Sequence, residues 1–332
     1  MKNLILKIFE NAGEKLAFQK EEKTENKHIY YFNYESFKSL NKLNLIIKSL
    51  REAVKPYKIN YDINNNLILK IEIVNNFKQI YYLSSYIKDA PKNQNYLLLG
   101  INENGAPVYE RIENIKSLLI AGSSGSGKSS AIHSLILSGL LLNNHLYFYL
   151  IDLKATELNI YNNLIKSNRI CEHVANDEKS ALKIIIKFYL LIKKRFKKMM
   201  RAGLRFSDEA PAVLVIDEYA QLFNDNKTKK IINNYIAKIG ALGRASNCYL
   251  ILATQHPTNE NINNTIRANL QSRCALRCLS PQQSNNIINS TEATKLNAPG
   301  EAIIRIDGKQ PQKIKTCFVS DKFLNAVIKA NS

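Results

Sequence analysis

The chain has 332 residues, and 45% of them are hydrophobic, so it can bury a substantial core in one large domain or two. Lys and Arg total 47 against 28 acidic residues, and the net charge of +19 is typical of a protein with a polyanionic partner. An AT-rich genome, whose codons favour Lys, Asn and Ile together, produces a similar bias, so charge alone does not identify the partner. The composition excludes an intrinsically disordered chain.

The first residues predict a helix rather than a targeting segment. Apolar side chains recur at helical spacing over residues 4–16, which favours a helix packed on its own domain over one that lies on a membrane or a partner. The start lacks a signal-peptide core and cleavage site, and no stretch reaches the ~18 apolar residues of a spanning helix. We therefore expect a cytoplasmic protein without integral membrane insertion. The five cysteines show no CxxC spacing, so we expect reduced, packed thiols rather than a metal site.

A small α/β domain is predicted over residues 1–90. Its pattern contains a strand at 28–32, a helix-period segment at 34–54 and a strand at 67–74. The polar segment 88–95 is the best candidate for a boundary. The rest of the chain predicts a larger domain at 91–320 and a C-terminal tail or helix at 321–332.

The larger domain begins with a predicted hairpin at 96–109, followed by a phosphate-binding loop. Residues 122–129 read GSSGSGKS between an apolar strand-like run and a helix-like run, which is the context that this motif requires. Its glycines let backbone N–H groups converge on phosphate oxygens at a helix N-terminus. We expect Lys128 against the β and γ phosphates of ATP and the Ser129 hydroxyl on Mg²⁺. The nucleotide-binding candidates are Gly122, Ser123, Ser124, Gly125, Ser126, Gly127, Lys128, Ser129 and Ser130.

Strand signals alternate with helical segments after the loop. They lie at 145–151, 212–216, 249–253 and 273–279, and short β-rich segments at 302–306 and 313–319 close the domain. Apolar strands in βα alternation predict an α/β fold with a mostly parallel central sheet flanked by helices. Ligands bind such sheets outside the carboxyl ends of the strands.

Polar residues follow three of these strands. Asp217 and Glu218 end one strand, where the first is expected to orient the Mg²⁺ shell and the second to polarise a water for attack on the γ phosphate. Gln255 ends the next strand and is placed to contact the γ phosphate or the attacking water. The polar residues after the strand at 145–151 are Asp152, Lys154 and Glu157. Strands that merely stop at polar surface residues are the alternative, which the phosphate-binding loop makes less favourable.

A basic stretch lies at 179–205, with ten Lys or Arg residues and no acid. Spacings of three and four put Lys194, Lys198, Arg201 and Arg205 on one helix face. Such a face has two interpretations, a solvated surface or a site for an anionic partner.

Several segments together resemble the motor domain of the FtsK/SpoIIIE family of hexameric DNA translocases, relatives of HerA and of conjugative coupling proteins. The resemblance runs from about residue 97 to 308. It depends on the order and spacing of LLIAGSSGSGKS, YLIDLKATELNIY, KRFKKMMRAG, VLVIDEYAQL, IAKIGALGRASNCYLILATQHP, IRANLQSRCAL and APGEAIIRIDG.

The resemblance implies a RecA-like P-loop fold, ATP and Mg²⁺ as ligands, a homo-oligomeric, hexameric ring, and double-stranded DNA as partner. By position it assigns Lys128 and Ser129 to nucleotide and Mg²⁺, Asp217 and Glu218 to metal and water, and Gln255 to sensing the γ phosphate. It also implies an arginine from the neighbouring subunit. The candidates for that arginine are Arg273 and Arg244, with Arg267 weaker.

Three positions depart from the family pattern. Leu153 stands in place of a common Pro, Gln221 in place of an acid, and His256 in place of the Arg of TQRP. The chain shows neither membrane helices before the motor nor room after it for a winged-helix module. We therefore expect a compact translocase of a plasmid, phage or integrative element, with a relaxase or a membrane complex as candidate partner.

Two other functions stay open. A protein-secretion motor of the same family acts on a polypeptide, although the positive charge favours DNA. A nucleotide-gated docking protein binds ATP without hydrolysing it. Glu218 argues against the second, because a pure switch has no use for a water-polarising carboxylate.

Overall fold

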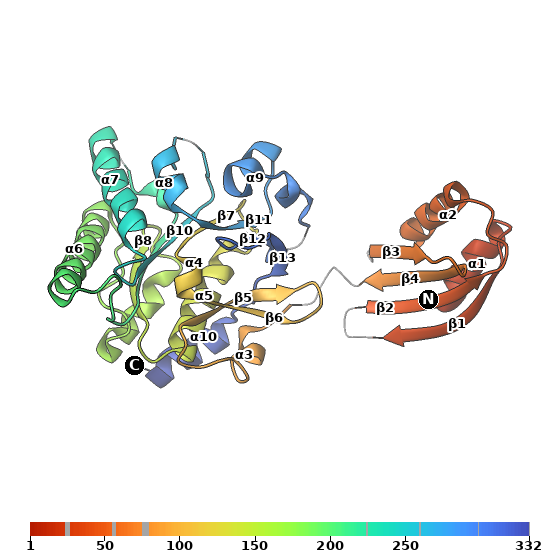
Figure 1. Ribbon diagram of the computed structural model, residues 1–332, viewed down its shortest axis with the longest axis horizontal. Helices are drawn as coiled ribbons and strands as arrows, with labels where there is room; N and C mark the ends of the chain where they lie inside the picture. Colours follow the sequence, from red (N-terminus) through yellow and green to blue (C-terminus); the bar gives the residue numbers. More distant parts are fainter. Residues whose placement is uncertain are drawn as a thin grey trace. The chain divides into compact units, whose positions relative to one another are not determined.

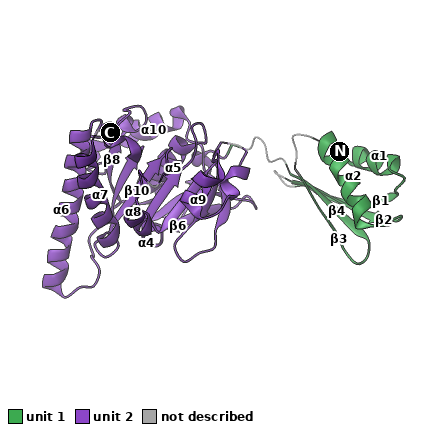
Figure 2. Cartoon of the chain, turned by 90° about the horizontal axis from the view of Figure 1, so that it is seen from above, with its two compact units in different colours: residues 1–80 green, residues 81–332 purple. Residues whose placement is uncertain are grey.

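The chain folds into two compact units, Met1–Ile80 and Tyr81–Ser332, shown in two colours in Figure 2. The computed structural model describes residues 1–23, 27–54, 58–74, 80–223, 225–258, 260–297 and 299–331. The division comes earlier in the chain than the boundary expected at residue 90. α3 (Leu83–Tyr86) lies between these two positions and belongs to the larger unit, because the Leu83 N–H donates to the Phe318 carbonyl.

The smaller unit is an antiparallel four-stranded sheet with two helices (Figure 1). Its elements are α1 (Lys2–Asn11), β1 (Leu16–Lys23), β2 (Lys27–Tyr34), α2 (Leu40–Ala53), β3 (Lys58–Ile63) and β4 (Ile68–Val74), and the strand order is β1-β2-β4-β3. Alternate residues of β4 are buried, so one face of the sheet packs on the helices. α1 buries Ile5 and Phe9 in this core, as expected for a helix packed on its own domain.

The strand predicted at 28–32 lies within β2, and the strand predicted at 67–74 is confirmed as β4, which begins one residue later at Ile68. The helix predicted from residue 34 begins only at Leu40. Residues of β2 up to Tyr34 pair with β1, and the opposite edge of β2 pairs with β4. Ser39 then caps α2, because its hydroxyl accepts the Lys42 N–H at 3.3 Å. The cap, and not the apolar periodicity, determines where this helix starts.

The larger unit is built on a nine-stranded mixed sheet with the order β6-β5-β13-β12-β11-β7-β10-β9-β8 (Figure 1). Its strands are β5 (Tyr96–Asn102), β6 (Pro107–Arg111), β7 (Ser117–Ala121), β8 (Tyr147–Asp152), β9 (Ala212–Asp217), β10 (Cys248–Thr254), β11 (Ser272–Leu276), β12 (Glu301–Arg305) and β13 (Gln312–Lys315). β11, β7, β10, β9 and β8 form a parallel half, and β12, β13, β5 and β6 extend it as an antiparallel half. The parallel sheet expected from the sequence is confirmed for the half formed by β11, β7, β10, β9 and β8.

Helices cover both faces of this sheet, so the unit has three layers. Along β9, Val213 and Val215 contribute to one core while Leu214 and Ile216 contribute to the other. The first core also takes residues from α4 (Ile112–Ile115), α5 (Lys128–Leu142), η1 (Leu158–Ser167) and α10 (Asp321–Asn331). The second takes residues from α6 (Glu178–Ala202), η2 (Tyr219–Gln221), α7 (Asn226–Leu242), α8 (Asn264–Asn269), α9 (Pro281–Ile288) and η3 (Glu292–Lys295). This burial on both faces explains why the central strands are almost continuously apolar.

The segment expected as a tail or helix at 321–332 contains α10 (Asp321–Asn331), which packs against η1. Across the described ranges, none of the helices combines the length and the apolar character needed to span a bilayer.

Candidate functional site

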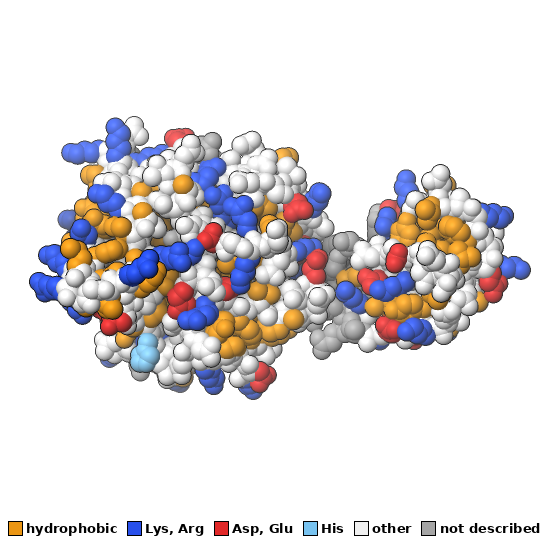
Figure 3. Space-filling view, in the orientation of Figure 1, with side chains coloured by type: hydrophobic (Ala, Val, Ile, Leu, Met, Phe, Trp, Pro, Cys, Tyr) orange, Lys and Arg blue, Asp and Glu red, His pale blue; other side chains and the backbone are white. Residues whose placement is uncertain are grey.

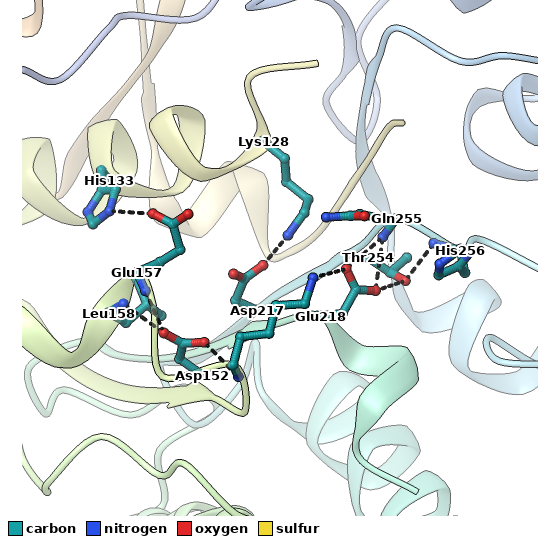
Figure 4. Close-up of polar contacts among 11 residues, drawn as sticks. Lys128, His133, Asp152, Glu157, Leu158, Asp217, Glu218, Thr254, Gln255 and His256 are labelled. Atoms are coloured by element: carbon teal, nitrogen blue, oxygen red, sulfur yellow. Dashed lines mark hydrogen bonds and ion pairs between the residues drawn. The ribbon is translucent and has the colours of Figure 1, made fainter. Parts of the chain in front are cut away.

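Neighbouring strands of the parallel half end at one edge, where they bring polar side chains together (Figure 4). Asp152 of β8 and Asp217 of β9 are register partners, and Thr254 of β10 pairs with Ala121 of β7. The phosphate-binding loop leaves β7 after Ala121 and enters α5 at Lys128. The fold thus gathers the loop and the polar strand ends that the sequence had marked.

The loop takes the backbone conformation that its glycines permit. Gly125 and Gly127 have φ values of +71° and +96°. A Cβ on Gly127 would lie 2.7 Å from the Gly300 nitrogen, whose N–H donates to the Ser126 carbonyl at 2.7 Å. The segment before β12 therefore packs so closely on the loop that position 127 has no room for a side chain.

The loop hydroxyls differ in what they contact. Ser123 Oγ donates to the Arg277 carbonyl at 3.0 Å, and Ser130 Oγ donates to the Cys317 carbonyl at 3.3 Å. Ser124 is exposed. Ser126 Oγ is buried, and no hydrogen-bond partner for it lies among the described residues. This unpaired hydroxyl and the start of α5 are suited to a phosphate-bearing ligand, because helix N-termini attract anions.

Lys128 and Asp217 form a buried ion pair across the site (Figure 4). Their side chains are 5% and 4% exposed. Two charges withdrawn from water are tolerated when they pair closely. Lys128 thus lies beside the loop expected to bind phosphates, and it is held by the carboxylate predicted for the metal.

The donor set fits Mg²⁺ bound together with a nucleotide. The Ser129 hydroxyl and the Asp217 carboxylate are hard oxygen ligands, which Mg²⁺ prefers. Within the part of the chain that the structure describes, no group of three His, Cys, Asp or Glu residues is arranged to hold a metal ion. Mg²⁺ commonly takes one or two protein ligands and completes its shell with phosphates and waters, so these residues suffice only with a phosphate ligand.

Glu218 is held in a fixed position at the end of β9. Its backbone lies in the left-handed region at φ +57°, and its side chain is 3% exposed. Thr254 Oγ1 donates to Glu218 Oε1 at 2.9 Å, and the Gln255 N–H donates to the same oxygen at 3.0 Å. Lys154 Nζ lies 3.8 Å from the other carboxylate oxygen. A non-glycine residue in this conformation is uncommon and is often found at functional positions.

Asp152 organises the loop that follows β8. The buried carboxylate accepts the N–H groups of Lys154 at 3.1 Å and of Glu157 and Leu158 at 2.9 Å (Figure 4). Asp152 is thereby fully engaged by its own loop. Its role is to position Lys154 and Glu157, the other two polar residues that the sequence had placed at this edge.

His133 belongs to the site, although the sequence analysis did not identify it. Its Nε2 lies 3.5 Å from Glu157 Oε2, and its Nδ1 lies 2.9 Å from the Tyr161 hydroxyl. The pKa of Glu157 lies below its ordinary value mainly because of the contact with His133, and the Ser129 hydroxyl contributes further. An ionisable residue one turn after Ser129 was the available signal, because the other side chains of α5 after Lys128 are apolar, Ser or Gly.

Gln255 and His256 follow β10. The side chain of Gln255 extends toward Lys128 (Figure 4), on the side where the γ phosphate is expected. His256 is exposed, and its backbone N–H donates to Thr254 Oγ1 at 3.0 Å.

The three arginine candidates lie in different environments. Arg273 is 8% exposed, and its guanidinium donates to the carbonyls of Arg267, Leu270 and Ile287 at 3.0–3.3 Å. Burial is the main cause that lowers the pKa of Arg273 to about 10. Arg267 is half-buried and donates to the Ile262 carbonyl. Arg244 follows the end of α7 and is exposed, so it is the candidate that a neighbouring molecule can reach.

The basic stretch forms most of α6. Lys194, Lys198 and Arg201 are exposed on this helix, and Figure 3 shows Lys and Arg side chains gathered at the end of the larger unit where α6 lies. Arg205 is not on the helix face, because α6 ends at Ala202 and Gly203 takes φ +66°. Lys198 is paired with Glu209 at 2.8 Å. The stretch is thus partly neutralised and partly free to attract an anion.

Comparison with known proteins places the chain in a family. The FtsK/SpoIIIE family matches residues 83–293, more than half of the chain. The chain belongs to the FtsK/SpoIIIE family. It is 29% identical over 308 residues to the DNA translocase FtsK of Lactiplantibacillus plantarum, covering 84% of this chain and 38% of that protein. It is 27% identical over 308 residues to the DNA translocase SpoIIIE of Bacillus subtilis, again covering 84% and 38%. The chain therefore spans about two fifths of the length of these FtsK/SpoIIIE relatives.

Solved structures confirm the RecA-like α/β fold. The pCW3 conjugation coupling protein TcpA, determined as a monomer with ATPγS, superposes with a TM-score of 0.68 at 17% identity, covering 99% of this chain and 100% of that one. The cytoplasmic domain of the type VII secretion ATPase EccC from Thermomonospora curvata gives a TM-score of 0.63 at 18% identity, covering 77% and 35%. At these identities the likeness concerns the fold of this FtsK/SpoIIIE member.

Proposed function

We propose that this chain is an ATPase motor that hydrolyses ATP with Mg²⁺ and uses the energy to move double-stranded DNA. The supporting observation is a phosphate-binding loop beside two carboxylates that are held differently. Asp217 forms an ion pair with Lys128, and Glu218 accepts hydrogen bonds from Thr254 and Gln255. The relatives named above as DNA translocases support DNA as the substrate, as does the net charge of +19.

The hydrolysis step follows from these positions. Lys128 leaves Asp217 and binds the β and γ phosphates, while the N–H groups of the loop hold the phosphate oxygens. Ser129 and Asp217 would hold Mg²⁺ together with the phosphates, and the ion would supply positive charge to the transferred phosphoryl group. Glu218 orients the attacking water and takes up its proton. Gln255 contacts the γ phosphate from the end of β10.

We further propose that the motor is a homo-oligomeric, hexameric ring. Arg244 is our choice for the arginine that enters the site of the neighbouring subunit, because it is exposed while the Arg273 guanidinium is engaged by three carbonyls. The fold shared with a conjugation coupling protein supports a role in transfer of a plasmid, phage or integrative element, with a relaxase or membrane complex as partner.

The test measures ATP turnover with and without duplex DNA over a range of salt. We expect duplex DNA to raise turnover and the effect to fall steeply with salt, because phosphate contacts release counterions. Glu218→Gln should retain nucleotide binding and lose turnover by about 10²–10⁴-fold. A rate that duplex DNA leaves unchanged contradicts the DNA motor. Nucleotide binding without any turnover in the unaltered protein supports the docking protein instead.

A protein-secretion motor is the second candidate, because the type VII secretion ATPase EccC shares the fold. The same assay separates the two if candidate substrate peptides are compared with DNA as stimulants. Stimulation by peptide alone favours the secretion motor.

A further inference from the structure

Lys154 is a cation in this site to which the hydrolysis scheme gives no role. Its Nζ lies 3.8 Å from Glu218 Oε2. The two side chains differ in exposure, with Lys154 37% exposed and Glu218 3% exposed. The ammonium group thus reaches a buried carboxylate from the solvent-accessible rim of the site.

The backbone of Lys154 is fixed by its own loop. The Lys154 N–H donates to Asp152 Oδ1 at 3.1 Å, and the Ala155 N–H donates to the Asp152 carbonyl at 3.1 Å. Ala155 has φ +56°, a conformation that costs a non-glycine residue free energy and persists only where the surroundings determine it. The loop therefore presents this lysine at a defined point beside Glu218.

Asp217 and Glu218 each have a lysine beside them, and in the proposed hydrolysis scheme nucleotide binding changes only the pair of Asp217 with Lys128. Lys128 is needed by the phosphates, and the charge of Asp217 then faces Mg²⁺. Glu218 keeps two neutral donors, the Thr254 hydroxyl and the Gln255 N–H. A buried charge is tolerated when an opposite charge lies beside it. Lys154 is the side chain placed to supply that cation while ATP is bound.

We propose that Lys154 is a positioning residue of ATP hydrolysis, which holds the Glu218 carboxylate in its orientation during the reaction. The inference rests on the proposed function and deepens it, because it assigns the loop after β8 to the hydrolysis step rather than to nucleotide binding. Lys154 acts through Glu218 and makes no contact with the reacting phosphate.

The first experiment compares Lys154→Met, Lys154→Arg and the matched control Lys166→Met, which changes an exposed lysine of η1 outside the site. We expect Lys154→Met to lower kcat by roughly 10–100-fold, while KM and the affinity for a fluorescent non-hydrolysable ATP analogue change by less than about 2-fold. Lys154→Arg restores most of the rate because it restores the charge. Lys166→Met keeps the parent rate.

The second experiment is a double-mutant cycle with Glu218→Gln. If Lys154 acts through Glu218, Lys154→Met has no further effect on kcat in that background. The same cycle is measured on nucleotide-free protein by urea unfolding. Lys154→Met should destabilise the parent more than the Glu218→Gln protein, because only the parent retains a buried charge at 218.

Three results overturn the proposal. If Lys154→Met weakens nucleotide binding and leaves kcat unchanged, Lys154 contacts a phosphate instead. If Lys154→Met raises kcat, its contact restrains Glu218. If Lys154→Met lowers kcat equally in the parent and in the Glu218→Gln protein, Lys154 does not act through Glu218. If the parent protein shows no turnover, the proposed function fails, while the unfolding cycle still decides whether Lys154 and Glu218 are coupled.

Discussion

The parallel and antiparallel halves of the large sheet contribute differently to the site. The polar strand ends Asp152, Asp217 and Thr254 all belong to the parallel half, because its strands run in one direction and finish at one edge. Alternating strands have no such common edge. The antiparallel half instead supports the phosphate-binding loop, through the contact of Gly300 with Ser126. Strand direction thus separates residues that carry the chemistry from residues that hold them in place.

Arg273 ties β11, the strand at the junction of the two halves, to the segments of α8 and α9, and its substitution should give the largest effect on stability. It lies on β11, which pairs in parallel with β7 and antiparallel with β12. We expect Arg273→Ala to lower the free energy of unfolding by roughly 2–4 kcal/mol, because three carbonyls lose their donors and a buried space opens. Urea unfolding measures this change.

Arg244→Ala is the control for this substitution. Because Arg244 is exposed, the free energy of unfolding of the variant should stay within about 0.5 kcal/mol of the parent value, while ATP turnover of the assembled protein falls. If both variants lose equal stability, the three carbonyl contacts of Arg273 do not stabilise the fold as described.

Gly127 tests whether the antiparallel half supports the loop. Gly125→Ala and Gly127→Ala both place a side chain at positive φ, but a Cβ at 125 meets nothing within 4 Å while one at 127 meets Gly300 at 2.7 Å. Gly127→Ala should therefore lower the stability of the nucleotide-free protein by about 1–3 kcal/mol more than Gly125→Ala. Equal values in urea unfolding would show that the loop does not depend on this contact.

The smallest effect is expected on the outer face of the parallel half, where Lys198 of α6 pairs with Glu209 at 2.8 Å. The Lys198 contact is the main cause that lowers the pKa of Glu209. A lowered folded-state pKa stabilises the protein above the unfolded-state pKa of about 4.3, and this contribution is lost as pH falls through the folded-state value. Lys198→Gln should cost about 0.2–1 kcal/mol at pH 7 and nothing at pH 2. A difference between the two proteins that does not change with pH contradicts this assignment.

The sequence predicted the parallel half well because its signals are local. Each strand is an apolar run that ends in a polar residue, and the loop motif fixes Lys128 and Ser129 by spacing alone. The prediction of Asp217, Glu218 and Gln255 at one edge needed only the rule that parallel strands share a carboxyl edge. Their chemical roles stay predictions until turnover is measured.

Other features were outside the reach of local patterns. β13 lies between β5 and β12, and its pairing with β5 joins Ile314 to Asn102, which are far apart in the chain. Arginine is usually exposed, so the sequence does not predict that Arg273 is buried. Its burial depends on carbonyl groups that only the folded chain places around it. Gly203 is a typical C-terminal cap, which indicates that α6 ends there. The expected helix was nevertheless extended to Arg205, because the run of basic residues continues to that position.

The ion pair between Lys128 and Asp217 balances two buried charges of the site against each other. A free triphosphate that takes Lys128 leaves a buried carboxylate without a counter-charge, and a free cation that takes Asp217 leaves a buried ammonium in the same condition. We therefore expect each ligand to remove the obstacle to the other, so that their affinities are linked reciprocally, and nucleotide titrations with and without a chelator measure that linkage. On this expectation the pair favours the metal complex of the nucleotide over either component alone.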